Sequence, residues 1–189
     1  MSIATPPSIA VTLAINPPSF KLGTQANVEL SVTAVSNASY PITIHTWPNI
    51  FNPGLSQIRG SLAGVDQDTH EELNLHMIDI RLRGDSNFNY TLGGSHDEYF
   101  VTLEPGQPRV FKTPFSPAHA KEGYRTEALP GHRYLVDLQE GETVGWWKRG
   151  RKEDVLDLPG QDRKVYHSDG KPIPLSLDEP VEFKVLPLE

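Results

Sequence analysis

Apolar and polar residues alternate with a period of two along several stretches of this 189-residue chain. Residues 9–15 read Ile-Ala-Val-Thr-Leu-Ala-Ile, and residues 28–34, 134–138 and 181–185 follow the same rule. A period of two sends successive side chains to opposite faces of a strand, so that one face is buried and the other is solvated. Strands of this kind are typical of antiparallel sheets, and we therefore expect an all-β protein.

Weaker runs and turn residues extend this pattern along the chain. The shorter runs lie at residues 42–44 and 78–82, with fainter ones at 21–23, 99–103 and 110–112. Because 17 prolines and 15 glycines are spread between the apolar stretches, short strands joined by turns are favoured over long helices. The sequence thus predicts an antiparallel immunoglobulin-like β-sandwich.

The domain organisation follows from where the apolar alternation begins and where it weakens. Residues 1–8 are expected to form a disordered or extended N-terminal arm, and residues 9–189 a single β-sandwich domain. The polar region near 146–180, rich in proline and glycine, predicts an elaborated loop region. A short helix is expected near 152–158, where Pro159 and Gly160 end it.

Tyr134 stands just after the turn Pro130-Gly131, at the start of an alternating run. Immunoglobulin-like sandwiches place a tyrosine corner at such a point, with the hydroxyl bonded to nearby backbone. The alternative is an ordinary buried tyrosine at the start of a strand. In either case the run predicts that Tyr134, Val136 and Leu138 are buried and that Asp137 is exposed.

Three groups of residues carry a resemblance to known proteins. They are Pro41-Ile42-Thr43-Ile44 with Trp47 and Phe51-Asn52-Pro53; Tyr99 to Pro105; and Gly131 to Tyr134, Gly141 to Trp147 and Lys152 to Leu156. Over residues 9–185 the chain resembles a family of small, uncharacterised proteins of filamentous fungi. Through the turn Leu103 to Gly106 it is also similar, more loosely, to BsuPI-type intracellular proteinase inhibitors. The resemblance implies a fungal, intracellular setting but transfers no activity, because fold does not carry function.

Charge and composition exclude several classes of function. The formal net charge is -7, and both nucleic acid and anionic membranes attract positive surfaces, so neither is an expected partner. Without cysteine the chain has no disulfide, no thiolate zinc site and no cysteine nucleophile. The N-terminus lacks the pattern of a signal peptide, and no apolar run approaches the ~20 residues of a membrane span. We therefore expect a cytoplasmic protein.

The densest group of oxygen ligands is the segment Asp66 to Glu72. A calcium-binding loop starting at Asp66 would need glycine at its sixth position and glutamate at its twelfth. Those positions hold Glu71 and Met77. The segment therefore indicates a solvated hairpin tip, and we predict neither a bound metal nor a cofactor.

The stretch Trp146 to Lys152 is the first candidate for a binding site. If Val144 and Trp146 face the core, Trp147 faces outward beside the cations Lys148, Arg149 and Arg151. Such a surface would bind an anionic or aromatic small molecule or an acidic protein segment. The alternative is that Glu153, Asp154 and Asp157 neutralise the cations while a loop covers Trp147.

A second candidate follows the predicted strand at 42–44. His45 and Trp47 share a face opposite Ile42 and Ile44, and with Arg59 they could line the mouth of a ligand-binding pocket. The alternative is that Trp47 lies in a second layer of the core.

Three functions remain open on the sequence. The first is a non-enzymatic, intracellular binding module, since the chain shows no P-loop, dinucleotide fingerprint, nucleophile elbow or HExxH motif. The second is an enzyme that acts on a small organic metabolite through acid–base residues such as His45, His96, Asp97 or Glu98. The third is an intracellular proteinase inhibitor, from the looser resemblance.

Overall fold

The computed structural model describes residues 7–22, 27–73, 75, 88–115, 117, 128–161 and 167–187. Strands dominate this part of the chain, which confirms the predicted all-β class. The strands are β1 (Ile9–Asn16), β2 (Ser19–Phe20), β3 (Glu29–Ser36), β4 (Ile42–His45), β5 (Leu62–Asp66), β6 (Glu72–Leu73), β7 (Phe100–Leu103), β8 (Pro108–Pro114), β9 (Arg133–Leu138), β10 (Thr143–Val144), β11 (Trp147–Arg149), β12 (Ile173–Pro174) and β13 (Val181–Val185). The helical elements are α1 (Pro53–Arg59), a 3₁₀ turn (Asp97–Tyr99) and α2 (Lys152–Val155).

Most of the predicted strands are present. The runs at 9–15, 28–34, 42–44, 134–138 and 181–185 fall on β1, β3, β4, β9 and β13, and the fainter runs at 99–103 and 110–112 fall on β7 and β8. The run at 78–82 lies outside the described residues. Lys21 and Leu22 belong to no strand, and α2 is shorter than the helix predicted at 152–158.

Helix α1 was not predicted. It begins at Pro53 and ends where Gly60 adopts a left-handed conformation with φ 77°. Proline suits the first helical position, and glycine suits the left-handed residue after a helix. With only seven residues, the helix is too short to show a period of 3.6. In the described part of the chain, no helix has the length and apolar character needed to cross a membrane.

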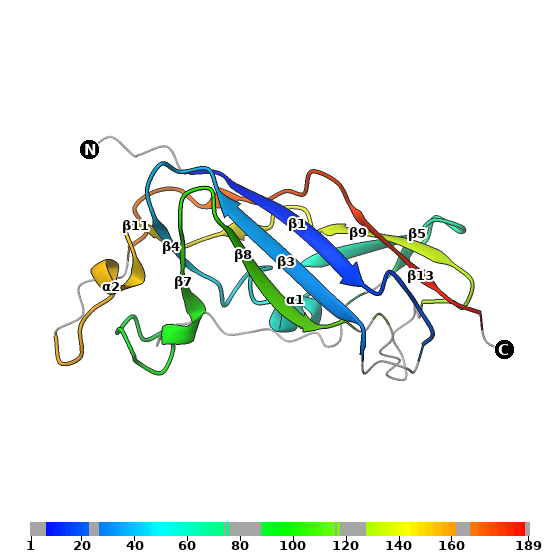
Figure 1. Cartoon of the computed structure of the whole chain (residues 1–189), viewed down its shortest axis with the longest axis horizontal. Helices are drawn as coiled ribbons and strands as arrows, with labels where there is room; N and C mark the ends of the chain where they lie inside the picture. Colours follow the sequence, from blue (N-terminus) through cyan, green and yellow to red (C-terminus); the bar gives the residue numbers. More distant parts are fainter. Residues whose placement is uncertain are drawn as a thin grey trace.

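The strands form four sheets, with the strand orders β1-β3-β8, β11-β4-β7, β2-β13-β9-β5-β6 and β10-β12. All neighbouring strands are antiparallel except β2 and β13, which are parallel. In Figure 1, β1, β3 and β8 run side by side along the middle of an elongated molecule. Strands β4, β7 and β11 lie toward one end of it, and β5, β9 and β13 toward the other.

One hydrophobic core joins the sheets. Along β1 and β9 every second side chain is buried, as the period of two predicts. Tyr134, Val136 and Leu138 lie in this core while Asp137 is exposed, so these predictions are confirmed. Phe183 of β13 stacks on Tyr134 with ring centroids 5.0 Å apart, which ties the last strand to β9.

The central strand of the β11-β4-β7 sheet is buried on both faces. All four residues of β4 are buried, although alternation would leave every second one in solvent. Ile42 and Ile44 lie in the main core, whereas Phe100 of β7, paired with His45, belongs to a second apolar cluster. This outer cluster consists of Phe88, Phe100, Trp146 and Leu156, with the half-buried Trp47, Tyr90, Leu92, Tyr99 and Val155 around them. Segments 88–99 and 151–157 therefore cover the outer face of this sheet.

Strand β8 lies at an edge of its sheet. It pairs with β3 alone among the described strands, and the N–H of Phe115 just beyond it donates to the carbonyl of Val28. Because hydrogen-bonded pairs alternate along an antiparallel ladder, Phe111 and Thr113 also bond to β3, while Val110 and Lys112 direct their N–H groups away from it. Pro108 and Pro114 share that outward register, which explains why a strand tolerates both prolines.

The hydroxyl of Tyr134 accepts a hydrogen bond from the N–H of Leu129, five residues upstream. This is the contact expected of a tyrosine corner, and it connects the start of β9 to the turn before it.

Tyr134→Phe should lower the free energy of unfolding by about 1 kcal/mol, because the N–H of Leu129 loses its acceptor. Denaturant titration of both proteins measures this difference. The matched control is Tyr40→Phe, since Tyr40 is half-buried and contacts Arg149 only through the face of its ring. If both variants unfold at the wild-type midpoint, the hydroxyl of Tyr134 contributes no stability.

Candidate functional site

Trp147 is buried, so its predicted exposure is wrong. Its side chain is 1% exposed and lies in the main core opposite Ile44, and its indole nitrogen donates to the carbonyl of Lys171 at 2.9 Å. The reason is that β10 ends at Val144 and β11 starts at Trp147, so the alternation restarts after Gly145 and Trp146. Trp146 instead enters the outer cluster and is also buried.

The neighbouring cations have separate partners. Lys148 Nζ lies 3.0 Å from an oxygen of Asp169, and Arg151 makes two hydrogen bonds to Glu104, at 2.7 and 3.2 Å. The guanidinium carbon of Arg149 lies 3.9 Å from the ring centroid of Tyr40. Each of these cations thus has a partner of its own, and with Trp146 and Trp147 both buried neither indole offers a stacking face to an aromatic ligand.

Trp147→Ala should therefore destabilise the fold by about 3–5 kcal/mol, as expected for removing a large buried aromatic side chain. Denaturant titration would show a lower midpoint. Trp147→Phe keeps most of the volume and loses the indole hydrogen bond, so it should fall between the alanine variant and the wild type. An unchanged midpoint for Trp147→Ala would contradict the buried position.

The structure does bring His45, Trp47 and Arg59 together. Arg59 Nη1 donates to the carbonyl of Trp47 at 2.8 Å, and its guanidinium carbon lies 5.5 Å from that ring. His45 is 7% exposed, with its ring centroid 4.2 Å from that of Phe88 and 5.0 Å from that of Phe100. The predicted place of His45 at a pocket mouth is therefore wrong, and Trp47 follows the alternative, a half-buried position in a second apolar layer.

His45 is held neutral by its surroundings. Burial lowers the pKa of His45 to about 4, with further contributions from the nearby His96 and Arg59. Its buried Nε2 has no hydrogen-bond partner among the described residues. An enclosed imidazole with so low a pKa is a weak base near neutral pH.

The other residues of the enzyme hypothesis hold the loop before β7. His96 Nδ1 accepts the N–H of Asn89 at 2.9 Å. Asp97 accepts Lys152 Nζ at 2.6 Å and the N–H of Gly93 at 3.1 Å. Burial raises the pKa of Asp97, but these two donors outweigh it and leave the pKa below its usual value. The polar groups of His96 and Asp97 therefore have structural partners.

The free energy of unfolding should depend on pH through His45. The unfolded side chain binds a proton near its ordinary pKa of 6.5, and the folded one only near 4. Stability from this source is therefore complete above pH 6.5 and is lost as the pH falls to about 4, by roughly 3 kcal/mol. Denaturant titrations across this pH range give the free energy of unfolding at each pH. For His45→Phe its slope against pH should be smaller than for the wild type. The control variant His70→Asn, at an exposed turn residue, should keep the wild-type slope. Equal slopes for wild type and His45→Phe would contradict the assignment.

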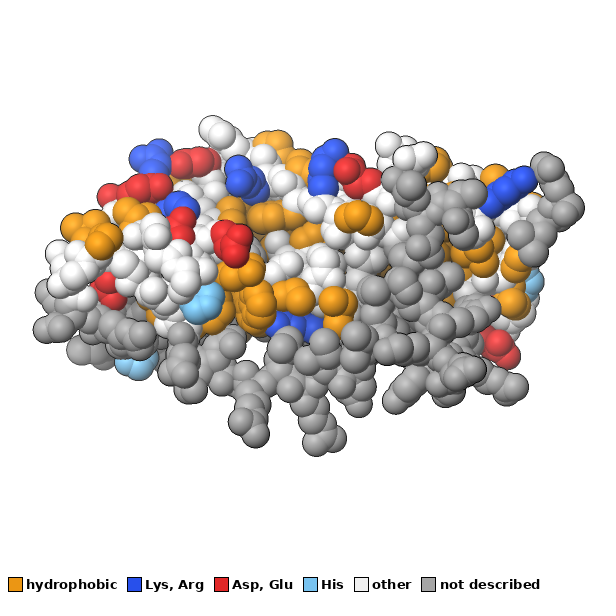
Figure 2. All heavy atoms as spheres, turned by 90° about the horizontal axis from the view of Figure 1, so that it is seen from below, with side chains coloured by type: hydrophobic (Ala, Val, Ile, Leu, Met, Phe, Trp, Pro, Cys, Tyr) orange, Lys and Arg blue, Asp and Glu red, His pale blue; other side chains and the backbone are white. Residues whose placement is uncertain are grey.

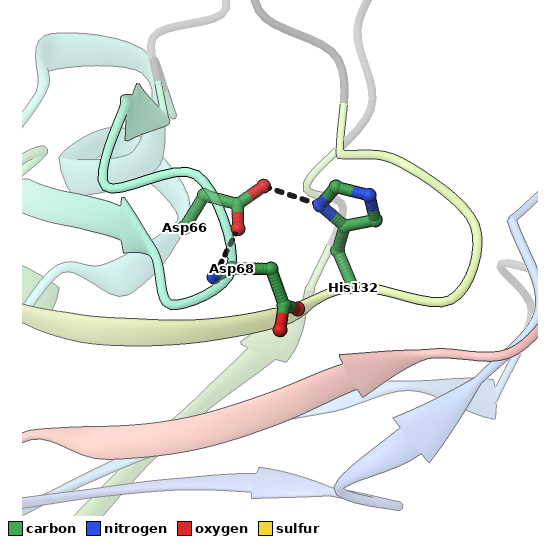
Figure 3. Close-up of side chains that lie close together, drawn as sticks. All are labelled: Asp66, Asp68 and His132. Atoms are coloured by element: carbon green, nitrogen blue, oxygen red, sulfur yellow. Dashed lines mark hydrogen bonds and ion pairs between the residues drawn. The ribbon is translucent and has the colours of Figure 1, made fainter.

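Asp66, Asp68 and His132 meet where the β5–β6 turn approaches the start of β9 (Figure 3). One oxygen of the buried Asp66 lies 2.7 Å from His132 Nδ1, and the other accepts the N–H groups of Asp68 and Thr69. Burial raises the pKa of Asp66, but the Asp68 N–H, His132 and the Thr69 N–H together hold it below its usual value. The predicted hairpin is confirmed and residues 68–72 are exposed, but Asp66 is buried, where its carboxylate shapes the turn.

These three side chains offer ligand atoms within 4.8 Å of one another, so among the described residues they could hold a metal ion. Both oxygens of Asp66 and the Nδ1 of His132 already have protein partners, and Asp68 accepts the N–H of Arg133 at 3.0 Å. Sequence analysis missed His132 because it lies 66 residues from Asp66, and only the pairing of β5 with β9 brings the two together.

A groove lies between β7 and β8. It consists of two adjoining hollows of about 480 and 200 Å³, and Glu98 and Val101 line both of them. The larger hollow has a mixed charged lining, with Arg109, Arg151 and Lys152 beside Glu104 and Glu153. Tyr99, Phe111 and Pro53 line the smaller one. The surface view shows basic, acidic and hydrophobic side chains close together on one face of the molecule (Figure 2).

The groove exists because β7 and β8 pair with strands of different sheets. β7 pairs with β4 and β8 pairs with β3, so the two consecutive strands enter different sheets. The turn between them is fixed by Gly106, whose φ is 65° and whose N–H donates to the carbonyl of Ser36 at 2.9 Å. Consecutive antiparallel strands usually pair with each other, and here their facing edges stay apart.

Comparison with known proteins gives no match to any protein-family model and none to a curated protein.

Proposed function

We propose that this chain is a non-enzymatic binding module that holds an extended segment of a partner protein in the groove between β7 and β8. The observation that carries the proposal is the groove itself, which runs between two strand edges. An extended peptide can add to such an edge through its backbone, with its side chains held in neighbouring pockets.

The lining of the groove supports a peptide ligand. Val101 and Phe111 give it an apolar floor, and charged side chains stand along its rim. A binding surface commonly combines an apolar centre with a polar rim in this way.

An immunoglobulin-like sandwich is part of the same proposal. Its support is that the β1-β3-β8 and β2-β13-β9-β5-β6 sheets share one core, and that Tyr134 makes the tyrosine-corner contact. Such sandwiches serve widely as interaction domains, although the architecture alone does not define a ligand.

Binding is favoured over catalysis by the state of the titratable groups. His45 is enclosed, and His96 and Asp97 are engaged by neighbouring donors and cations. Of the four acid–base residues considered for an enzyme, this leaves Glu98, which lines both hollows of the groove.

Peptides selected from a random display library against the full chain should bind at the groove. In NMR titrations with the selected peptides, the largest amide shifts should fall on Val101, Thr102, Arg109, Val110 and Phe111. A control set of amides is that of the opposite end, around Asp66 and His132. A failure to select binders, or shifts confined to the control set, would contradict the proposed function.

A further inference from the structure

Arg109 is the least engaged arginine of the described residues. Arg59 and Arg149 lie against aromatic rings, Arg151 bonds to Glu104, and Arg133 approaches Asp68 at 3.9 Å. Arg109 has no hydrogen bond, ion pair or ring contact within the described part of the chain, and it is exposed. An unpaired guanidinium in a hollow of about 480 Å³ is suited to bind a carboxylate, because its planar donors match both oxygens.

The register of β8 places this guanidinium beside the apolar floor. Arg109 and Phe111 face the same side of the strand, since they are two residues apart and oppose Ala34 and Val32 of β3. Both residues line the groove, and Phe111 shares its hollow with Val101. A ligand strand laid along β8 would therefore present to the groove only side chains of one parity.

The backbone of β8 limits where such a strand can pair. Val110 and Lys112 direct their N–H and carbonyl groups outward, and these groups have no partner among the described residues. Pro108 has no N–H to offer, and Gln57 Nε2 of α1 already donates to the carbonyl of Pro114 at 3.0 Å. The free part of the edge is therefore short and centred on Val110 to Lys112.

We infer, resting on the proposed function, that the occupant is an extended peptide segment that adds to the edge of β8, with an acidic and an apolar side chain two residues apart. The carboxylate binds Arg109, and the apolar side chain lies on Phe111 and Val101. The spacing of two is required because only residues of equal parity on a strand face the groove together.

The first experiment tests the spacing. Two sets of eight-residue peptides carry one glutamate and one leucine in an otherwise threonine and serine sequence, either two positions apart or one position apart. Each set contains both orders of the pair, because the ligand strand could run in either direction. In fluorescence anisotropy with the full chain, one order with spacing two should bind about tenfold more tightly than both peptides with spacing one. Equal affinity for the two spacings would overturn the inference.

The second experiment tests the ion pair by charge reversal. Arg109→Glu should lower the affinity for the glutamate peptide about tenfold. The same variant should bind the peptide that carries lysine in place of glutamate as tightly as the wild type binds the glutamate peptide. Arg133→Glu, an exposed arginine on β9, is the matched control and should leave both affinities unchanged. Restoration by the lysine peptide also shows that the variant is folded. Loss without restoration would overturn the role of Arg109.

The third experiment tests strand addition and separates this inference from the proposed function. N-methylation of the peptide at the residues that pair with Val110 and Lys112 should abolish binding, because it removes the backbone donors. If peptides shift the amides of β7 and β8 but tolerate N-methylation, the inference fails while the proposed groove stands. If no extended peptide binds there, both fail. Sedimentation that shows a dimer broken by Arg109→Glu would assign the edge to a second copy and overturn the inference.

Discussion

Burial of β4 on both faces of the β11-β4-β7 sheet is the constraint on which the rest of the structure depends. Its inner face joins the main core through Ile42, Ile44 and Trp147. Its outer face would expose His45 and Phe100 to water if the outer cluster did not cover them. The loop before β7 and the segment around α2 are therefore part of the fold, because a bare outer face would leave a large apolar patch in solvent.

The same covering explains the state of the titratable groups. His45 is held neutral because it packs against Phe88 and Phe100, where a charged imidazole would be poorly solvated. Lys152 binds Asp97, and Thr102 accepts the N–H of Lys152, so α2 is fixed to the 3₁₀ turn by a charge pair and to β7 by a neutral bond. Groups that resemble catalytic residues in the sequence thus stabilise contacts between segments distant in the chain.

The groove follows from how β7 and β8 are divided between sheets. β7 completes the β11-β4-β7 sheet, and β8 completes the β1-β3-β8 sheet, so their connecting turn spans a change of layer. An edge strand left in this position would invite uncontrolled pairing between chains. Pro108, Pro114 and the charge of Lys112 restrict that pairing to a short central window, which is the place where we propose that a partner strand is bound.

Local pattern determined much of the architecture. Alternation in β1, β3, β9 and β13 fixed the strands and their buried faces, because the period of two is a property of the strand itself. The position of Tyr134 after a Pro-Gly turn indicated the hydroxyl contact with the upstream backbone. Tertiary structure alone decided the rest. The break at Gly145 and Trp146 turned Trp147 inward, the outer cluster enclosed His45, and strand pairing joined Asp66 to His132. The groove was equally hidden, since it depends on which sheet each of two consecutive strands enters, and that choice is made by long-range packing rather than by local sequence.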